Sequence, residues 1–154
     1  MLPRVLAEPQ DAEARLGMAV AAYYGGVAIN QVNVGSIHAI AHQLGSLYHL
    51  PHGVANNMVM PHLLRVYGVC AEPKLAELAA LAGIDDTQSN LAARVIDAIE
   101  LLGVNANLPT TCDAITKSDY PRLISRAVEE SDGYVSPRLL TEADVASVLD
   151  RISG

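Results

Sequence analysis

The chain has few aromatic residues, which are common in β-sheets. Among its 154 residues there is no phenylalanine and no tryptophan, and the only aromatic residues besides the histidines are six tyrosines. Its composition, 51% hydrophobic and rich in alanine and leucine, favours helices over strands. We therefore expect an all-α fold, a helical bundle that forms a single domain over residues 1–154.

Cysteine is also scarce. Cys70 and Cys112 are too few and too far apart for a disulfide framework or a four-thiolate zinc site, and we expect each to be a small buried hydrophobic residue in a reducing cytoplasm. The first residues lead to Glu8, Asp11 and Glu13 instead of an apolar run. This pattern predicts no signal peptide and a cytoplasmic location.

Basic residues are outnumbered. Ten lysines and arginines against 17 aspartates and glutamates give a formal net charge of −7, which excludes a surface for nucleic-acid phosphates. Residues 16–37 are long enough to suggest a membrane span, but Asn30, Gln31 and Asn33 make the stretch too polar for one. We expect no membrane partner.

Charge is missing altogether from one long window. No Asp, Glu, Lys or Arg occurs between Leu16 and Leu64, yet this window holds all five histidines, His38, His42, His49, His52 and His62. Because an unpaired charge is costly in a low-dielectric interior, we expect a charge-free window of this length to be buried. Neutral imidazole can lie in such an interior and still offer a lone pair or a proton. The window predicts a metal or acid–base site in a hydrophobic helical core.

Residues that typically start or end helices recur along the chain, whereas the alternation of apolar and polar residues typical of strands does not. Pro9 to Asp11 opens a predicted helix that runs to about residue 32. A capping-box-like segment at 141–144 begins the last helix, which runs to residue 152. Further helices are predicted over residues 37–47, 54–67, 72–82, 87–102 and 120–130, with an irregular connection over 105–113. Gly68, Gly83 and Gly103 are the expected ends of the helices over 54–67, 72–82 and 87–102. No Gly-x-Gly-x-x-Gly follows a strand pattern, so this chain has no evident dinucleotide-binding fold of its own.

Three histidines have spacings that can bring them together. His38 and His42 are four residues apart, which places both on one helix face, and a chain reversal near Gly45 and Pro51 can return His52 to that face. Three imidazoles predict a site for Zn²⁺ or Fe²⁺. The alternative is a set of core histidines bonded to backbone carbonyls, since His-x-x-x-His alone is a weak pattern.

The other polar residues of the window carry weaker signals. We expect His49 and His62 to be structural or peripheral, and Asn56 and Asn57 to form hydrogen bonds within their helix. A zinc hydrolase normally has a glutamate directly after its first histidine, where this chain has Ala39. The absence of any acid in the window disfavours hydrolysis, whereas hydride transfer from an alcohol needs no such carboxylate base.

Two segments resemble the signature of the iron-dependent (group III) alcohol dehydrogenases, in the dehydroquinate synthase-like superfamily. They are residues 35–45, Gly-Ser-Ile-His-Ala-Ile-Ala-His-Gln-Leu-Gly, and residues 50–62, which include Leu-Pro-His-Gly-Val-Ala-Asn-Asn and Met-Pro-His. Residues 13–26 resemble the helix before this signature, 108–109 a family turn, and 136–138 the family's Asn-Pro-Arg. The similarity extends to nearly the whole chain.

The resemblance implies a function and a role for each histidine. In that family an N-terminal α/β domain binds NAD(P), and an all-helical C-terminal domain holds one divalent metal through one Asp and three His. It implies that His38 and His52 are metal ligands, with Fe²⁺ the usual ion and Zn²⁺ possible. His42 leaves the metal triad and becomes a catalytic residue near the nicotinamide that assists hydride or proton transfer. The implied reaction is hydride transfer between a small alcohol or aldehyde and NAD(P).

This chain departs from the family pattern upstream of the signature. The family's other two ligands form an Asp-x-x-x-His pair, and no such spacing occurs before residue 38. Two imidazoles without a carboxylate bind metal weakly. We therefore expect weakly bound or absent metal and little or no dehydrogenase activity from this chain alone, with NAD(P) bound only if a nucleotide-binding domain is supplied.

The absence of a nucleotide-binding domain pattern also predicts binding partners, and other functions are compatible with the sequence. A mean hydropathy of +0.24 predicts open apolar surface, covered in a homo-oligomer or by a separate nucleotide-binding chain. One alternative function is a non-catalytic helical oligomerisation or partner subunit that retains the fold. The least favoured is a zinc hydrolase, which would need an acid from another chain.

Overall fold

The computed structural model describes residues 1–84 and 90–154, and the regular elements in these ranges are all helices. The only pairing of strand type among them is an isolated bridge between Cys112 and Ser153. The all-α prediction is confirmed. The elements are α1 (Leu2–Ala7), α2 (Ala12–Val32), α3 (Ser36–Tyr48), α4 (His52–Tyr67), η1 (Gly68–Cys70), α5 (Glu72–Ala82), α6 (Leu91–Asn105), η2 (Lys117–Asp119), α7 (Tyr120–Ser131) and α8 (Glu142–Ile152).

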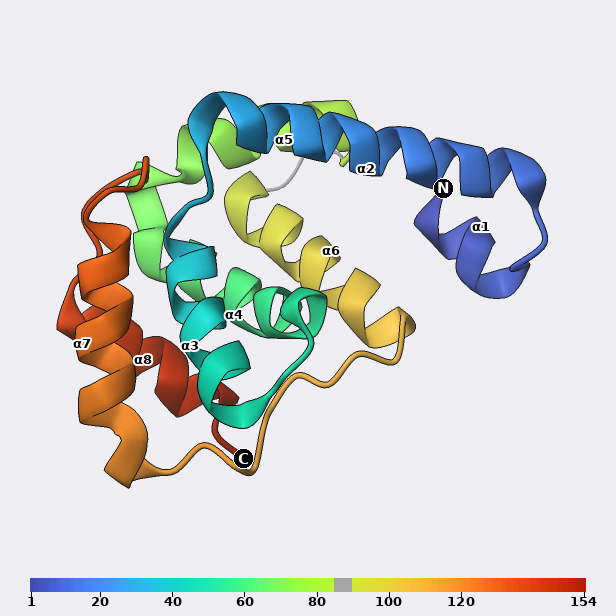
Figure 1. Cartoon of the computed structure of the whole chain (residues 1–154). Helices are drawn as coiled ribbons and strands as arrows, with labels where there is room; N and C mark the ends of the chain where they lie inside the picture. Colours follow the sequence, from blue (N-terminus) through green and yellow to red (C-terminus); the bar gives the residue numbers. More distant parts are fainter. Residues whose placement is uncertain (85–89) are drawn as a thin grey trace.

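The helices form a packed body and an extended arm (Figure 1). In the body, α4 packs against α3, α6 and α8, while α7 packs against α3 and α8, and α5 covers α6. The arm is α2, which runs along the top of the view, with the short α1 folded back at its far end. The core lies between the body helices, and its largest fully buried side chains are those of Ile40, Leu44, Met58, Val59, Leu63, Val145, Val148, Leu149 and Ile152.

Most predicted helix ends are confirmed because their caps are local. The Asp11 side chain accepts a hydrogen bond from the Ala14 amide and caps α2, and Thr141 with Asp144 forms the capping box of α8. Gly68 and Gly83, both at positive φ, end α4 and α5.

The structure differs from the predicted helices at two places. Helix α1 was not predicted, and the predicted start at residue 87 lies outside the described residues. Gly103, expected to end α6, lies inside it and is buried. The side chain of Asn57 on α4 fills the space that a Cβ of Gly103 would occupy, so this glycine allows the two helices to approach closely.

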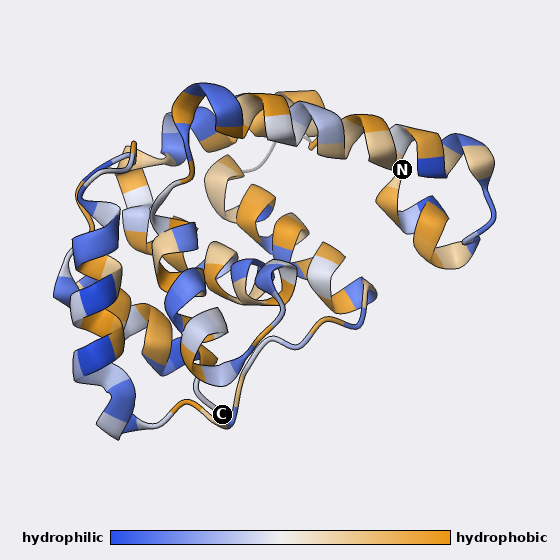
Figure 2. Cartoon of the chain, viewed as in Figure 1, coloured by the Kyte–Doolittle hydropathy of each residue, from blue (hydrophilic) through white to orange (hydrophobic). Residues whose placement is uncertain are grey.

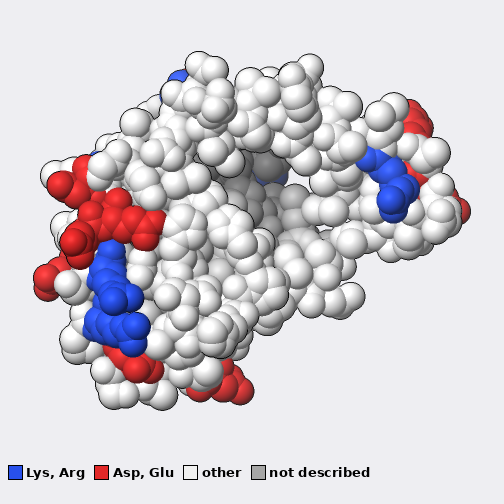
Figure 3. All heavy atoms as spheres, viewed as in Figure 1, with Lys and Arg blue, Asp and Glu red and all other residues white. Residues whose placement is uncertain are grey.

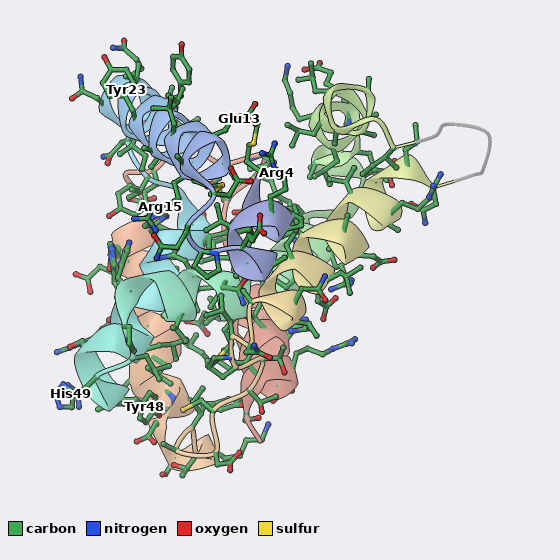
Figure 4. All side chains as sticks on the ribbon, turned by 90° about the vertical axis from the view of Figure 1, so that its right-hand side faces the viewer. Arg4, Glu13, Arg15, Tyr23, Tyr48 and His49 are labelled. Atoms are coloured by element: carbon green, nitrogen blue, oxygen red, sulfur yellow. The ribbon has the colours of Figure 1, made fainter. Side chains whose placement is uncertain are left out.

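The expected burial of the charge-free window is wrong for its first part. Every residue from 19 to 33 is exposed, including Tyr23 at 68% and Val32 at 58%. Apolar residues lie along the length of α2 (Figure 2), and on the face drawn in Figure 3 most charged atoms lie near the left, lower and right margins, while the surface along α2 is largely uncharged. Figure 4 shows Tyr23 projecting away from the body. A helix that is apolar around much of its circumference is normally covered, so α2 presents an unpartnered surface.

Other expectations about burial and membrane contact can be checked directly. Cys70 is exposed and Cys112 is half-buried, so the prediction of two buried thiols is wrong for Cys70. It lies in η1, where the chain turns over the surface between α4 and α5. In residues 1–84 and 90–154 no helix is long and apolar enough to cross a membrane.

The segment before α8 is fastened to the body by Arg138. Its guanidinium makes two hydrogen bonds to the Asp144 carboxylate, at 2.6 and 2.9 Å, and one of 3.1 Å to the Val66 carbonyl oxygen. It also lies over the Tyr67 ring, 5.7 Å from the ring centre. The Arg138 hydrogen bond, aided by the cap bonds of Thr141, lowers the pKa of Asp144 to about 2.

We expect Arg138→Met to lower the free energy of unfolding by about 1–3 kcal/mol, because it leaves a mostly buried carboxylate without its cation. The folded pKa of Asp144 lies below its unfolded value, so the pair stabilises the fold above about pH 4 and this contribution is lost as the pH falls toward 2. Urea unfolding at pH 7 and pH 3 measures both effects. Arg126→Met, at an exposed position on α7, is the control. Equal losses in the two variants would contradict the assignment.

Candidate metal and proton-transfer site

Three imidazoles meet where α3 and α4 adjoin. His38 and His42 lie one turn apart on α3, and His52 is the first residue of α4. His49, in the left-handed conformation with φ of 55°, ends α3 and reverses the chain, which brings His52 back toward the α3 pair. The ring centres are 5.7 Å apart for His38 and His42, 5.2 Å for His38 and His52, and 5.4 Å for His42 and His52. The three histidines grouped by their spacing therefore lie together.

The start of α3 is held in place by the loop that precedes Arg138. The Ser36 and Ser136 hydroxyls are 2.6 Å apart and share a hydrogen bond, and Ser36 is buried. A Cβ on Gly35 would lie 3.5 Å from the Val135 carbonyl oxygen, so the loop runs close to the helix start. Because His38 follows within the first turn, this contact helps to fix its ring position.

The site is more open than the sequence suggested. His52 is exposed, His38 is half-buried, and the His42 side chain is 39% exposed. The prediction of a dry pocket inside a hydrophobic core is therefore wrong for this chain. The backs of the helices are buried, with Ala39 and Ala41 beside the histidines both in the core, so the imidazoles form a polar surface patch on a packed base.

The spacing of His38 and His52 fits two ligands of one ion. Two imidazoles that share a tetrahedral metal at Zn–N distances of about 2.1 Å have ring centres roughly 5 Å apart. The observed separation is 5.2 Å. Among the described residues, however, no group of three or more His, Cys, Asp or Glu side chains is arranged to hold a metal ion. The residues present thus fit part of a coordination sphere that needs further donors.

His38 is suited to be neutral at physiological pH. Partial burial, and then the nearby His52 and His42, lower the pKa of its imidazole, while Glu130 raises it. A neutral ring keeps the lone pair that a metal requires. The electrostatics around His38 therefore favour the form that can bind a cation.

Asn56 lies one turn after His52 and contacts its ring. The Asn56 amide nitrogen donates a hydrogen bond of 2.9 Å to the His52 carbonyl oxygen and lies 3.2 Å from His52 Nε2. Its Oδ1 atom is buried and has no hydrogen-bond partner among the described residues. Asn56 is a hydrogen bonder within its helix, as expected, and it also has a polar atom without a partner close to the candidate site.

A carboxylate that the sequence analysis did not identify completes the cluster. Glu130 on α7 places Oε1 2.6 Å from His42 Nδ1, across 88 positions of sequence. The amide of Gln43 donates to Glu130 Oε2 at 2.7 Å, and the Tyr134 hydroxyl donates to Oε1 at 2.9 Å. The fold thus places a carboxylate of this chain beside His42, from a helix outside the charge-free window. No local spacing in the sequence could have revealed this contact, because α3 and α7 meet only in the folded body.

The remaining two histidines lie apart from the cluster. His49 projects into solvent from the end of α3 (Figure 4). His62 on α4 lines a separate cavity of about 150 Å³ with Arg65, Val66, Ser147 and Arg151. Partial burial lowers the pKa of His62, with further lowering from Arg65 and Arg151.

Comparison with known proteins defines the class. Residues 1–153 match the model of the Fe-containing alcohol dehydrogenase family, C-terminal, and the chain belongs to this family. It is 34% identical over 153 residues to the 1,3-propanediol dehydrogenase of Klebsiella pneumoniae, a match that covers 96% of this chain and 39% of the relative. It is 33% identical to the NAD-dependent methanol dehydrogenase of Bacillus methanolicus, over 96% of this chain and 40% of that protein.

Solved structures give the same picture of the fold. A crystal structure of 1,3-propanediol oxidoreductase superposes with a TM-score of 0.90 at 31% identity, covering 97% of this chain and 41% of that one. The alcohol dehydrogenase from Oenococcus oeni superposes with a TM-score of 0.88 at 26% identity, covering 97% and 40%. The chain therefore spans about two fifths of the length of the relatives it matches.

Proposed function

We propose that this chain supplies the metal-binding catalytic domain of an NAD(P)-dependent alcohol dehydrogenase, which transfers hydride between a small alcohol or aldehyde and nicotinamide. The observation that carries the proposal is the 5.2 Å separation of the His38 and His52 rings in a chain of this family. Relatives named for propanediol and methanol support small alcohols as the substrate class, and one named as NAD-dependent supports the nicotinamide.

Each histidine has its own role in this proposal. His38 and His52 hold a divalent metal, Fe²⁺ by family or Zn²⁺ by ligand type, and a metal bound there polarises the alcohol oxygen. His42 takes the proton-transfer role, with Nδ1 hydrogen-bonded to Glu130 and Nε2 left to face the substrate. Its ring lies between 5 and 6 Å from both neighbours by ring centres, so a proton leaving a substrate beside His38 and His52 would meet it.

The metal assignment is tested by ligand removal. We expect His38→Ala and His52→Ala each to weaken Zn²⁺ binding at least about tenfold, because each removes a donor from a set that is already short. His49→Ala, which removes an exposed imidazole outside the cluster, serves as the control and should bind as the unchanged chain does. Equilibrium dialysis followed by elemental analysis gives the affinities. An equal loss in His49→Ala, or none in the other two variants, would refute the assignment.

The 154-residue chain on its own should show little or no turnover. Two imidazoles neither neutralise nor enclose a divalent ion, and the described residues provide no three-ligand group. An NADH absorbance assay with methanol, 1,3-propanediol and their aldehydes, run with added Fe²⁺ or Zn²⁺, measures this. Robust turnover by the isolated chain would show that the residues present suffice.

The surface of α2 favours a proposal about assembly. No charged residue occurs between Arg15 and the end of this helix, and many of its apolar side chains are exposed. Such a surface is suited to contact with another polypeptide. This observation also keeps the second candidate function open, a helical partner subunit without catalysis.

For the isolated chain we propose that a second copy covers α2, forming a homo-oligomer. Sedimentation velocity should show a species larger than 16.3 kDa. The double change Leu16→Glu and Tyr23→Glu, at two exposed positions of this helix, should shift the chain toward monomer because it places charge on the contact. Leu139→Glu, at an exposed apolar position outside α2, is the control. A strictly monomeric unchanged chain would contradict the proposal.

A further inference from the structure

Glu130 makes a short polar contact with His42, the histidine of the cluster to which the proposal gives no metal role. Its Oε1 lies 2.6 Å from His42 Nδ1, within the range of a short charge-assisted hydrogen bond. The Glu130 side chain is 26% exposed, so the contact is partly shielded from water. The carboxylate belongs to α7 and the imidazole to α3, and the close packing of these helices keeps the two groups together.

Glu130 is itself held in one place. The Gln43 amide donates to its Oε2 atom at 2.7 Å and also bonds the Ala39 carbonyl oxygen at 3.1 Å, which anchors Gln43 to α3. The Tyr134 hydroxyl donates to Oε1 at 2.9 Å. Burial and this contact with Glu130 raise the pKa of Tyr134, so its hydroxyl keeps the proton that it donates. Three donors therefore converge on one carboxylate.

This arrangement dictates the tautomer of His42. An ionised carboxylate only accepts hydrogen bonds, so the His42 nitrogen that faces it must carry a proton. When the ring is neutral, that proton is on Nδ1, and Nε2 has a bare lone pair. No other hydrogen bond to the His42 ring is made within residues 1–84 and 90–154. Nε2 is thus a hydrogen-bond acceptor without a protein partner among them.

We propose that Glu130 is a positioning residue, which fixes His42 as its Nδ1–H tautomer and keeps Nε2 available to accept a hydrogen bond from a substrate hydroxyl. The inference rests on the proposed function for its substrate, an alcohol, and adds the residue that determines which end of His42 meets it. The side chains of Gln43 and Tyr134 support Glu130 by donating hydrogen bonds to its carboxylate. With the opposite tautomer, a neutral His42 would present a donor at Nε2, which cannot accept a hydrogen bond from an alcohol.

The experiment reads the tautomer directly. Long-range ¹H–¹⁵N correlation spectra of the ¹⁵N-labelled chain, recorded at alkaline pH without metal or nucleotide, distinguish the protonated from the bare ring nitrogen. We expect the Nδ1–H form of His42 to dominate in the unchanged chain. In Glu130→Ala the ratio of Nδ1–H to Nε2–H should fall about tenfold or more, because a charge-assisted hydrogen bond is lost.

Two matched variants separate positioning from general damage to the fold. Glu130→Gln retains an acceptor oxygen and should preserve the Nδ1–H tautomer. Glu129→Ala removes a neighbouring exposed carboxylate of the same helix and should leave the ratio unchanged. Helical circular dichroism and the melting temperature establish that each variant folds. Should Glu130→Ala prove unfolded, Tyr134→Phe provides the test, since it removes one donor to Oε1 and should broaden or shift the His42 signals.

The outcomes distinguish this inference from the proposed function. A dominant Nε2–H form in the unchanged chain, or an unaltered ratio in a folded Glu130→Ala variant, overturns the role of Glu130 whatever the metal data show. Conversely, the tautomer shift can occur in a chain whose His38→Ala variant binds Zn²⁺ as well as the unchanged chain does. In that case the positioning role stands and the metal assignment fails.

Discussion

The chain reversal between α3 and α4 is the constraint on which the site depends. His49 adopts a left-handed conformation at the end of α3, and α4 begins with His52, three residues later. This compact turn brings the ring of His52 to 5.2 and 5.4 Å from the rings of His38 and His42. The helices cannot separate without exposing the core side chains of Leu44 and Val59, so the packing that stabilises the fold also fixes the spacing of the imidazoles.

Absence of charge has two different causes along the same window. In α3 and α4 many of the uncharged residues form the core of this chain, and three of the five histidines lie together at its surface. In α2 the residues are just as uncharged but face solvent. The composition of a segment shows that it is apolar, but it does not show whether the segment packs within its own chain or against another surface. The same physical preference therefore builds a core in one segment and leaves an unpartnered surface in the other.

The sequence predictions were accurate where the deciding interaction is local in sequence and inaccurate where it is a tertiary contact. Helix ends set by local caps, such as Asp11, Gly83 and the Thr141–Asp144 box, were predicted within a residue or two, because each cap bonds to its own helix. The His38–His42 pair was equally local, since a helix places residues four apart on one face. Gly103 was misread as a helix end, because only the Asn57 side chain from another helix explains a glycine at that position.

Glu130 marks the limit of such reasoning and also changes how the site is understood. Sequence spacing gives a set of histidines with no carboxylate in the charge-free window, which disfavoured a zinc hydrolase. The fold supplies a carboxylate through the packing of α7 on α3, and it directs this carboxylate to His42 instead of to the rings of His38 and His52. A histidine whose Nδ1 donates to a carboxylate keeps a defined tautomer with its lone pair on Nε2, whereas no carboxylate is bonded to the ring of His38 or His52 among the described residues. The tertiary contact thus separates three chemically identical side chains into two kinds, a difference that their spacing in the sequence does not contain.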